Sequence, residues 1–345
     1  MSTVELINTA LGTVIDPELH KPLPELGMVE SVNFTDGVAK INILLTIIGC
    51  PMKDRLHSDI TKSLANISEV KTVEINFGVM NEEQRNNVKK LIRGGREKFI
   101  PFAQPDSLTR VLGIASGKGG VGKSSVTVNL AVAAAARGLK VGILDADVYG
   151  HSIPRLMGIL DKRPTAIDQT FIPVENYGVK VVSMEMFKPE RSDPVAYRGP
   201  LLHRVLEQLL SDAFWGDLDL LLLDLPPGTG DVMMDLKDFI EDPKMILVTT
   251  PQANAAHIAI KAGYAAKDLN QELIGVVENM SYYEVNGEKH YIFGKNGGKQ
   301  VADELLVELL AQLPIVPSDN SIYAESDLVG IQYLNLAHKI LKLIK

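Results

Sequence analysis

One short stretch of this sequence has the residue types and spacing of a phosphate-binding loop. Residues 117–124 read GKGGVGKS and match GxxxxGK[ST], directly after the apolar run RVLGIAS and before the helix-forming run SSVTVNLAVAAAARG. Glycines allow backbone amides to surround phosphate oxygens, and the following helix adds the positive end of its dipole. An ordinary glycine-rich turn is the alternative, but the complete motif between a strand and a helix favours a nucleotide site.

The motif assigns roles to individual residues. Lys123 is expected to reach the β and γ phosphates of ATP, and the Ser124 hydroxyl is expected to bind Mg²⁺. The predicted nucleotide-binding residues of the loop are Gly117, Lys118, Gly119, Gly120, Val121, Gly122, Lys123, Ser124 and Ser125.

Carboxylates follow two other apolar runs of the sequence. Asp145 and Asp147 end the run GILDAD, and Asp224 follows four consecutive leucines. Ligands of open α/β sheets bind beyond the carboxyl ends of the strands, so these side chains are expected to converge on the phosphates. We predict that Asp224 binds Mg²⁺ through water and that Asp147 polarises the attacking water. Helix capping is an alternative for Asp145 alone.

The elements that must position these residues follow from the hydrophobic pattern. Continuously apolar runs alternate with helical stretches from Arg110 onward: RVLGIAS, KVGILDAD, VKVVSM, LDLLLLDLPPG, KMILVTT and IGVVENM. Strands of this kind predict a mostly parallel sheet with helices on both faces. We therefore expect an α/β, doubly wound P-loop domain over residues 109–345.

A different pattern precedes this domain. Residues 1–80 predict a small α+β domain, with a helix up to Val14, a strand in VAKINILLTI, a helix after GCPMKDRL and a strand in VKTVEINF. Residues 81–108 are polar, charged and contain glycine, which is typical of a helix end followed by a linker.

Composition restricts the classes of function. A net charge of −8 argues against a general nucleic-acid binder, since such proteins cluster Lys and Arg on phosphates. Cys50 is the only cysteine, so no disulfide closes within the chain. No signal peptide or membrane-spanning run is evident, and we expect a cytoplasmic protein. The scattered histidines, which include His203, show no HExxH or paired spacing and argue against a zinc enzyme.

Several motifs together resemble a known family. KGGVGKS, DADVYGHSIP and DLPPGTGD resemble the deviant Walker A ATPases, and RGP at 198–200, VENMSYY at 277–283 and HYIFGKNGG resemble the Mrp/ApbC branch. Members of this branch are ATPases described as iron–sulfur cluster carriers or assembly factors. VIDPEL and LTIIGCPM resemble the MIP18-type domain that is often fused to bacterial members.

The resemblance implies two further site residues. Lys118 would reach across a nucleotide-sandwiched homodimer to the partner's ATP and act in catalysis with Lys123 and Asp147. A solvated surface lysine is the alternative. Asn279 would read the adenine base, because an amide offers both a donor and an acceptor. Capping of the following loop is the alternative for Asn279.

The sequence departs from the family at the cluster site. Cluster-carrying members have a CxxC after the ENMSYY-like stretch, whereas this chain has Glu284, Val285 and Asn286 there. Neither a carboxylate nor an amide replaces a thiolate as a ligand of an iron–sulfur cluster. Cys50, before Pro51, is the remaining candidate for a reactive thiol or cluster ligand, and a buried cysteine acting as a small hydrophobe is the alternative.

Two functions from different classes follow. The first is a slow, dimer-dependent ATPase that carries iron–sulfur clusters or delivers them to apoproteins. The second is a nucleotide-switched regulatory protein that has lost cluster binding along with the CxxC. A membrane- or DNA-bound positioning ATPase rests on superfamily analogy alone. The last helix, YLNLAHKILKLIK, has an apolar stripe that we expect to dock on the domain rather than on a membrane.

Overall fold

The protein folds into two compact units in its computed structural model. The described residues are 2–46, 52–92, 99–167, 170–188, 199–228, 231–241, 243–317 and 321–344. The first unit contains residues 1–99 and 165–172, and the second contains residues 100–164 and 173–345.

The first unit is built on a three-stranded sheet with the order β1-β2-β3, in which β1 is antiparallel to β2 and β2 is parallel to β3. Its main elements are α1 (Thr3–Leu11), β1 (Val29–Thr35), β2 (Val38–Leu45), α2 (Lys53–Leu64), β3 (Thr72–Val79) and α3 (Glu82–Ile92). Leu56, Ile60 and Leu64 are buried along one face of α2, at the spacing that an amphipathic helix requires. Ser2 and Glu5 form a capping box that begins α1.

A short hairpin from later in the sequence also belongs to the first unit. It consists of β6 (Thr165–Ile167) and β7 (Thr170–Ile172), which pair antiparallel. The buried Thr165 donates from Oγ1 to Glu18 Oε1 at 2.7 Å. Burial is the main cause that raises the pKa of Glu18, and the hydrogen bond from Thr165 opposes it. The hairpin therefore contacts the loop that carries the DPEL sequence.

The second unit contains an eight-stranded sheet with the order β15-β12-β11-β4-β10-β5-β9-β8. All neighbouring strands are parallel except β8 and β9. The strands are β4 (Arg110–Ser116), β5 (Val141–Asp145), β8 (Val174–Asn176), β9 (Val179–Ser183), β10 (Leu220–Asp224), β11 (Lys244–Thr249), β12 (Glu272–Glu278) and β15 (Glu308–Gln312).

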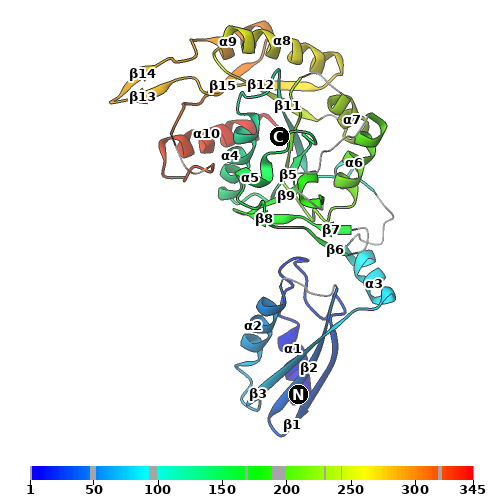
Figure 1. The fold of residues 1–345 in the computed structure, drawn as a ribbon. Helices are drawn as coiled ribbons and strands as arrows, with labels where there is room; N and C mark the ends of the chain where they lie inside the picture. The colour runs from blue at the N-terminus through cyan, green and yellow to red at the C-terminus, as the bar shows by residue number, and fades with distance from the viewer. Residues whose placement is uncertain are drawn as a thin grey trace. The chain divides into compact units, whose positions relative to one another are not determined.

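Helices cover both faces of this sheet, and α4 and α10 lie together on one face (Figure 1). The helices are α4 (Lys123–Ala136), α5 (Ile153–Leu156), α6 (Gly199–Ser211), α7 (Asp231–Phe239), α8 (Ala253–Asp268), α9 (Gly297–Glu304) and α10 (Leu328–Leu343), with 3₁₀ turns η1 (Pro101–Ala103) and η2 (Met184–Phe187). Every residue of β5 and β10 is buried, as expected for parallel strands covered on both sides. The predicted doubly wound fold is confirmed.

The last helix packs into the core of this unit. Tyr333, Leu336 and Ile340 of α10 are buried in the same cluster as Leu130 of α4. Burial raises the pKa of Tyr333 far above its ordinary value. The expected docking of this helix is confirmed. No helix among the described residues is long and apolar enough to cross a membrane.

Candidate nucleotide site

The phosphate-binding loop connects β4 to α4 at the carboxyl edge of the sheet. Gly120 and Gly122 both have φ near +82°, a left-handed conformation that favours glycine. A Cβ on Gly117 would lie 2.5 Å from the backbone of Ala259, so α8 packs directly on the start of the loop. A Cβ on Gly122 would lie 2.2 Å from the amide nitrogen of Asn279. At three positions of the loop, therefore, either the backbone conformation or the lack of space for a side chain requires glycine.

Asp224 is the centre of a buried polar network at this loop. Its Oδ2 accepts from Lys123 Nζ and from Ser124 Oγ, each at 2.6 Å, and its Oδ1 accepts from Thr127 Oγ1 at 2.6 Å. Asp224 is 0% exposed and Lys123 is 6% exposed. Three donors thus compensate a carboxylate that would be costly to bury alone. The structure brings the predicted residues Lys123, Ser124 and Asp224 into one cluster.

Thr127 was missed by the sequence reasoning. It lies one helical turn after Lys123 on α4, so both side chains lie on the face toward β10. The i, i+4 spacing of Lys123 and Thr127 predicts that they share a helix face. Only the fold shows that this face is turned toward Asp224.

Asp145 lies beside Asp224, because the two residues are paired in register on neighbouring strands. Its Oδ2 accepts from Ser183 Oγ at 3.0 Å, and its buried Oδ1 has no hydrogen-bond partner among the described residues. Burial, followed by the charge of Asp224, raises the pKa of Asp145 well above its ordinary value. Hydroxyl and carboxylate oxygens gathered in this way suit Mg²⁺, which prefers oxygen ligands.

Asp147 lies outside this hydrogen-bonded network. It is partly buried, and its Oδ1 accepts from Gly150 N at 2.9 Å. Its charge contributes to the raised pKa of Asp145, as a neighbouring carboxylate does. The predicted water-polarising residue therefore stands in the loop after β5, next to the buried carboxylates.

Lys118 has a defined partner in the structure. Its Nζ donates to Gln252 Oε1 at 3.3 Å, and Gln252 is the residue that precedes α8. The side chain of Lys118 is partly buried, and its carbonyl accepts from Ser116 Oγ at 3.2 Å. Gln252 is a second residue that the sequence reasoning missed, because 134 positions separate it from Lys118.

Asn279 contacts the phosphate-binding loop itself. The side chain is buried, its Nδ2 donates to Val121 O at 2.9 Å, and its backbone N donates to Thr249 O at 2.8 Å. One of the two N–H donors of this amide is used on the loop backbone. The observed hydrogen bond gives Asn279 a role in positioning the loop, and its contact with adenine stays a prediction.

We predict that Asn279→Ala weakens ATP and GTP binding to the same extent. Loss of a buried hydrogen bond that leaves an acceptor without a partner costs about 1–3 kcal/mol. Isothermal titration with both nucleotides measures the effect, and Asn254→Ala on the exposed surface of α8 is the control. A selective loss of ATP binding with GTP binding unchanged would instead assign Asn279 to the base.

The position of the family's CxxC is a tight hairpin. Its strands are β13 (Tyr283–Val285) and β14 (Glu288–His290), and Asn286 and Gly287 between them both have positive φ. Such a two-residue turn suits the Asn-Gly pair. Glu284 and Val285 therefore lie on β13 and Asn286 lies in the turn, and none of the three is a soft ligand for iron. Cys50, Pro51 and Arg198 lie outside the described residues.

The fold and the site define a class of protein. A doubly wound parallel sheet, a glycine loop ending in Lys123 and Ser124, and a buried aspartate on the adjacent strand are the features of a P-loop nucleotide-binding protein. The family model described as NUBPL iron-transfer P-loop NTPase matches residues 107–340, and the chain belongs to this family. A second model, described as iron-sulfur cluster assembly protein, matches residues 5–77.

Two relatives cover nearly the whole chain, and a similar solved structure covers 66% of it. An iron-sulfur cluster carrier protein of Mycobacterium tuberculosis is 49% identical, over 93% of this chain and 85% of its own length. One of Bacillus subtilis is 38% identical, over 97% of this chain and 96% of its own length. A nucleotide-binding protein of Archaeoglobus fulgidus, solved in complex with ADP and with cobalt, is 34% identical with a TM-score of 0.50, over 66% of this chain and 87% of its own.

Proposed function

We propose that this protein is a dimeric ATPase that carries iron–sulfur clusters and delivers them to apoproteins. The carrier function is supported by the names of full-length relatives and by the family to which the chain belongs. The observation that carries the nucleotide chemistry is the buried network of Lys123, Ser124 and Thr127 on Asp224. The regulatory alternative is not favoured, since the relatives are named as carriers.

The donor set at the loop fits the expected Mg²⁺. Ser124 would bind the ion directly and Asp224 through water, and Mg²⁺ would supply positive charge to the β and γ phosphates. Binding of a triphosphate requires Lys123 Nζ to exchange its bond to Asp224 for phosphate oxygens. After that exchange Asp224 Oδ2 would still accept from Ser124 Oγ and could also accept from a water, so nucleotide binding and magnesium binding would be coupled through one carboxylate.

The remaining steps belong to Asp147 and Lys118. Asp147 would orient the attacking water from the loop after β5 and accept a hydrogen bond from it. Lys118 would leave Gln252 and offset the charge that develops on the partner subunit's γ-phosphate, which makes hydrolysis depend on the dimer. The dimer and these roles are proposals that rest on the family resemblance and on the half-buried position of Lys118.

The single cysteine of each chain limits the number of thiolate ligands that this protein can offer to an iron–sulfur cluster. A bridging cubane cluster usually has four thiolate ligands, whereas a dimer of this chain offers two, both from Cys50. We therefore propose that the cluster is held transiently, with Cys50 as the protein's thiolate and with the other ligands coming from the client or from small thiols. The location in the cytoplasm and the lack of nucleic-acid and stable membrane partners remain predictions.

We predict that anaerobic reconstitution with iron, sulfide and glutathione gives a coloured protein that activates an apo-ferredoxin. Cys50→Ser is expected to abolish both the visible absorption of the protein and the transfer, because the chain has no other cysteine. Transfer is followed by ferredoxin absorbance with and without ATP.

The control for this experiment is Ser63→Ala, a change on α2 of the same unit that leaves the thiol in place. A wild-type protein that stays colourless and transfers nothing would contradict the carrier function and favour the regulatory alternative. Cluster binding that survives Cys50→Ser would contradict only the role of Cys50.

A further inference from the structure

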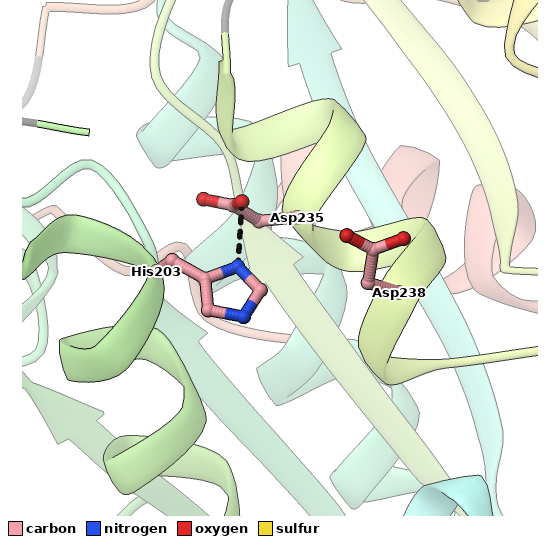
Figure 2. A group of neighbouring side chains, drawn as sticks. All are labelled: His203, Asp235 and Asp238. Carbon is pink, nitrogen blue, oxygen red and sulfur yellow. Dashed lines mark hydrogen bonds and ion pairs between the residues drawn. The ribbon is translucent and has the colours of Figure 1, made fainter. Parts of the chain in front are cut away.

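Three potential metal ligands, none of which belongs to the hydrogen-bonded network of Asp224, come together where α6 meets α7. His203 lies on α6, and Asp235 and Asp238 lie one turn apart on α7. Figure 2 shows the imidazole of His203 hydrogen-bonded to Asp235, with Asp238 farther along α7. One ligand atom of each of the three residues lies within 4.8 Å of the others. His203 Nδ1 and Asp235 Oδ1 are 2.8 Å apart. The three side chains are thus close enough to bind one ion after small side-chain rotations.

The pairing of His203 with Asp235 does not compensate all the charge of the cluster. Asp235 has a side chain that is only 15% exposed, and its buried Oδ2 has no hydrogen-bond partner among the described residues. The exposed carboxylate of Asp238 adds a second negative charge on the same helix face. Two carboxylates this close repel each other, and a cation between them would remove the repulsion. A hydrogen bond to one imidazole leaves at least one negative charge uncompensated.

Neighbouring groups hold the imidazole in place. The ring of His203 packs on the ring of Phe239 with centroids 4.5 Å apart, so the ring has a fixed support at the end of α7. The His203 side chain remains 40% exposed, which leaves the cluster accessible to an ion from solvent. The contact with Phe239 therefore limits the positions of the imidazole, and the exposed edge of the ring lets an ion reach it.

We propose that His203, Asp235 and Asp238 bind a divalent transition-metal ion that links α6 to α7. One imidazole nitrogen and two carboxylate oxygens suit Zn²⁺, Co²⁺, Mn²⁺ or Fe²⁺ better than Mg²⁺, which is bound mainly through oxygen and water. Binding of the ion at His203 Nδ1 would release the proton of the His203–Asp235 hydrogen bond to solvent, and water would complete the coordination. This site uses none of the residues of the phosphate-binding loop and does not depend on the proposed function.

The test measures metal binding to the tag-free, full-length chain in a Cys50→Ser background, without nucleotide. Titration with Co²⁺, followed by its visible absorption, and competition with Zn²⁺ are expected to show about one ion per chain at this site. Asp238→Asn removes an exposed ligand and is expected to weaken binding at least about tenfold. Asp238→His supplies another ligand and is expected to restore binding with a shifted cobalt spectrum.

Matched controls separate this site from general surface binding. His57→Ala removes an exposed histidine from α2 and is expected to leave the titration unchanged. Circular dichroism of Asp238→Asn without metal should match that of the parent protein, since this carboxylate is exposed. Equal affinity in the parent and in Asp238→Asn would overturn the proposal, as would a cobalt spectrum that Asp238→His leaves unaltered.

Discussion

Asp224→Asn is expected to destabilise the second unit by about 3–5 kcal/mol, the cost of removing one partner of a buried ion pair. The change leaves the ammonium of Lys123, which is only 6% exposed, without its carboxylate. The amide also presents a donor to a network in which Lys123, Ser124 and Thr127 already donate. Urea unfolding followed by the fluorescence of Trp215 measures the effect, because this single tryptophan is buried in the same unit.

Two comparisons identify the cause of this loss. Asp219→Asn changes an exposed carboxylate just before β10 and is expected to leave the unfolding midpoint nearly unchanged. Thr127→Ala removes one neutral donor and is expected to cost about 1 kcal/mol, less than the loss of the charge. Equal midpoints for Asp224→Asn and the wild type would show that the ion pair does not stabilise the fold. In Asp224→Asn we also expect that adding Mg²⁺ no longer increases the affinity for ATP.

Lys118→Ala is expected to lower ATP turnover by about 10²–10³-fold, the usual cost of losing one fixed group that stabilises transition-state charge. The affinity for ATP is expected to stay close to that of the wild type, since in the proposed mechanism Lys123 and the loop backbone bind the phosphates within one subunit. Single-turnover phosphate release and equilibrium titration with a fluorescent ATP analogue measure the two quantities separately. This prediction rests on the proposed dimer.

Gln252 provides an internal control for the role of Lys118. Gln252→Ala removes the hydrogen-bond partner of Lys118 Nζ but keeps the cation, so turnover is expected to persist or to rise. Lys140→Ala removes an exposed charge at the opposite end of β5 and is expected to have no effect. Unchanged turnover in Lys118→Ala would contradict the catalytic role. Monomeric behaviour of an Asp147→Ala variant saturated with ATP, in size-exclusion chromatography with light scattering, would contradict the dimer.

Local patterns in the sequence were sufficient for the fold class and the centre of the site. The motif from Gly117 to Ser124 is contiguous, so its chemistry is readable without the fold. Asp145 and Asp224 end apolar runs, and parallel strands place such ends at one edge of the sheet. Continuous apolar strands and the amphipathic last helix likewise encode their own burial. These features depend on spacing within one element, which the sequence determines by itself.

Contacts between distant elements were decided only by the tertiary structure. Three hydrogen bonds of the site join residues that are far apart in the sequence: Lys118 with Gln252, Asn279 with the carbonyl of Val121, and Ser183 with Asp145. His203 and Asp235 are 32 positions apart and follow no metal-binding motif, yet the packing of α6 on α7 places them in contact. Helix packing and strand order set these distances, because they depend on the whole hydrophobic core rather than on neighbouring residues.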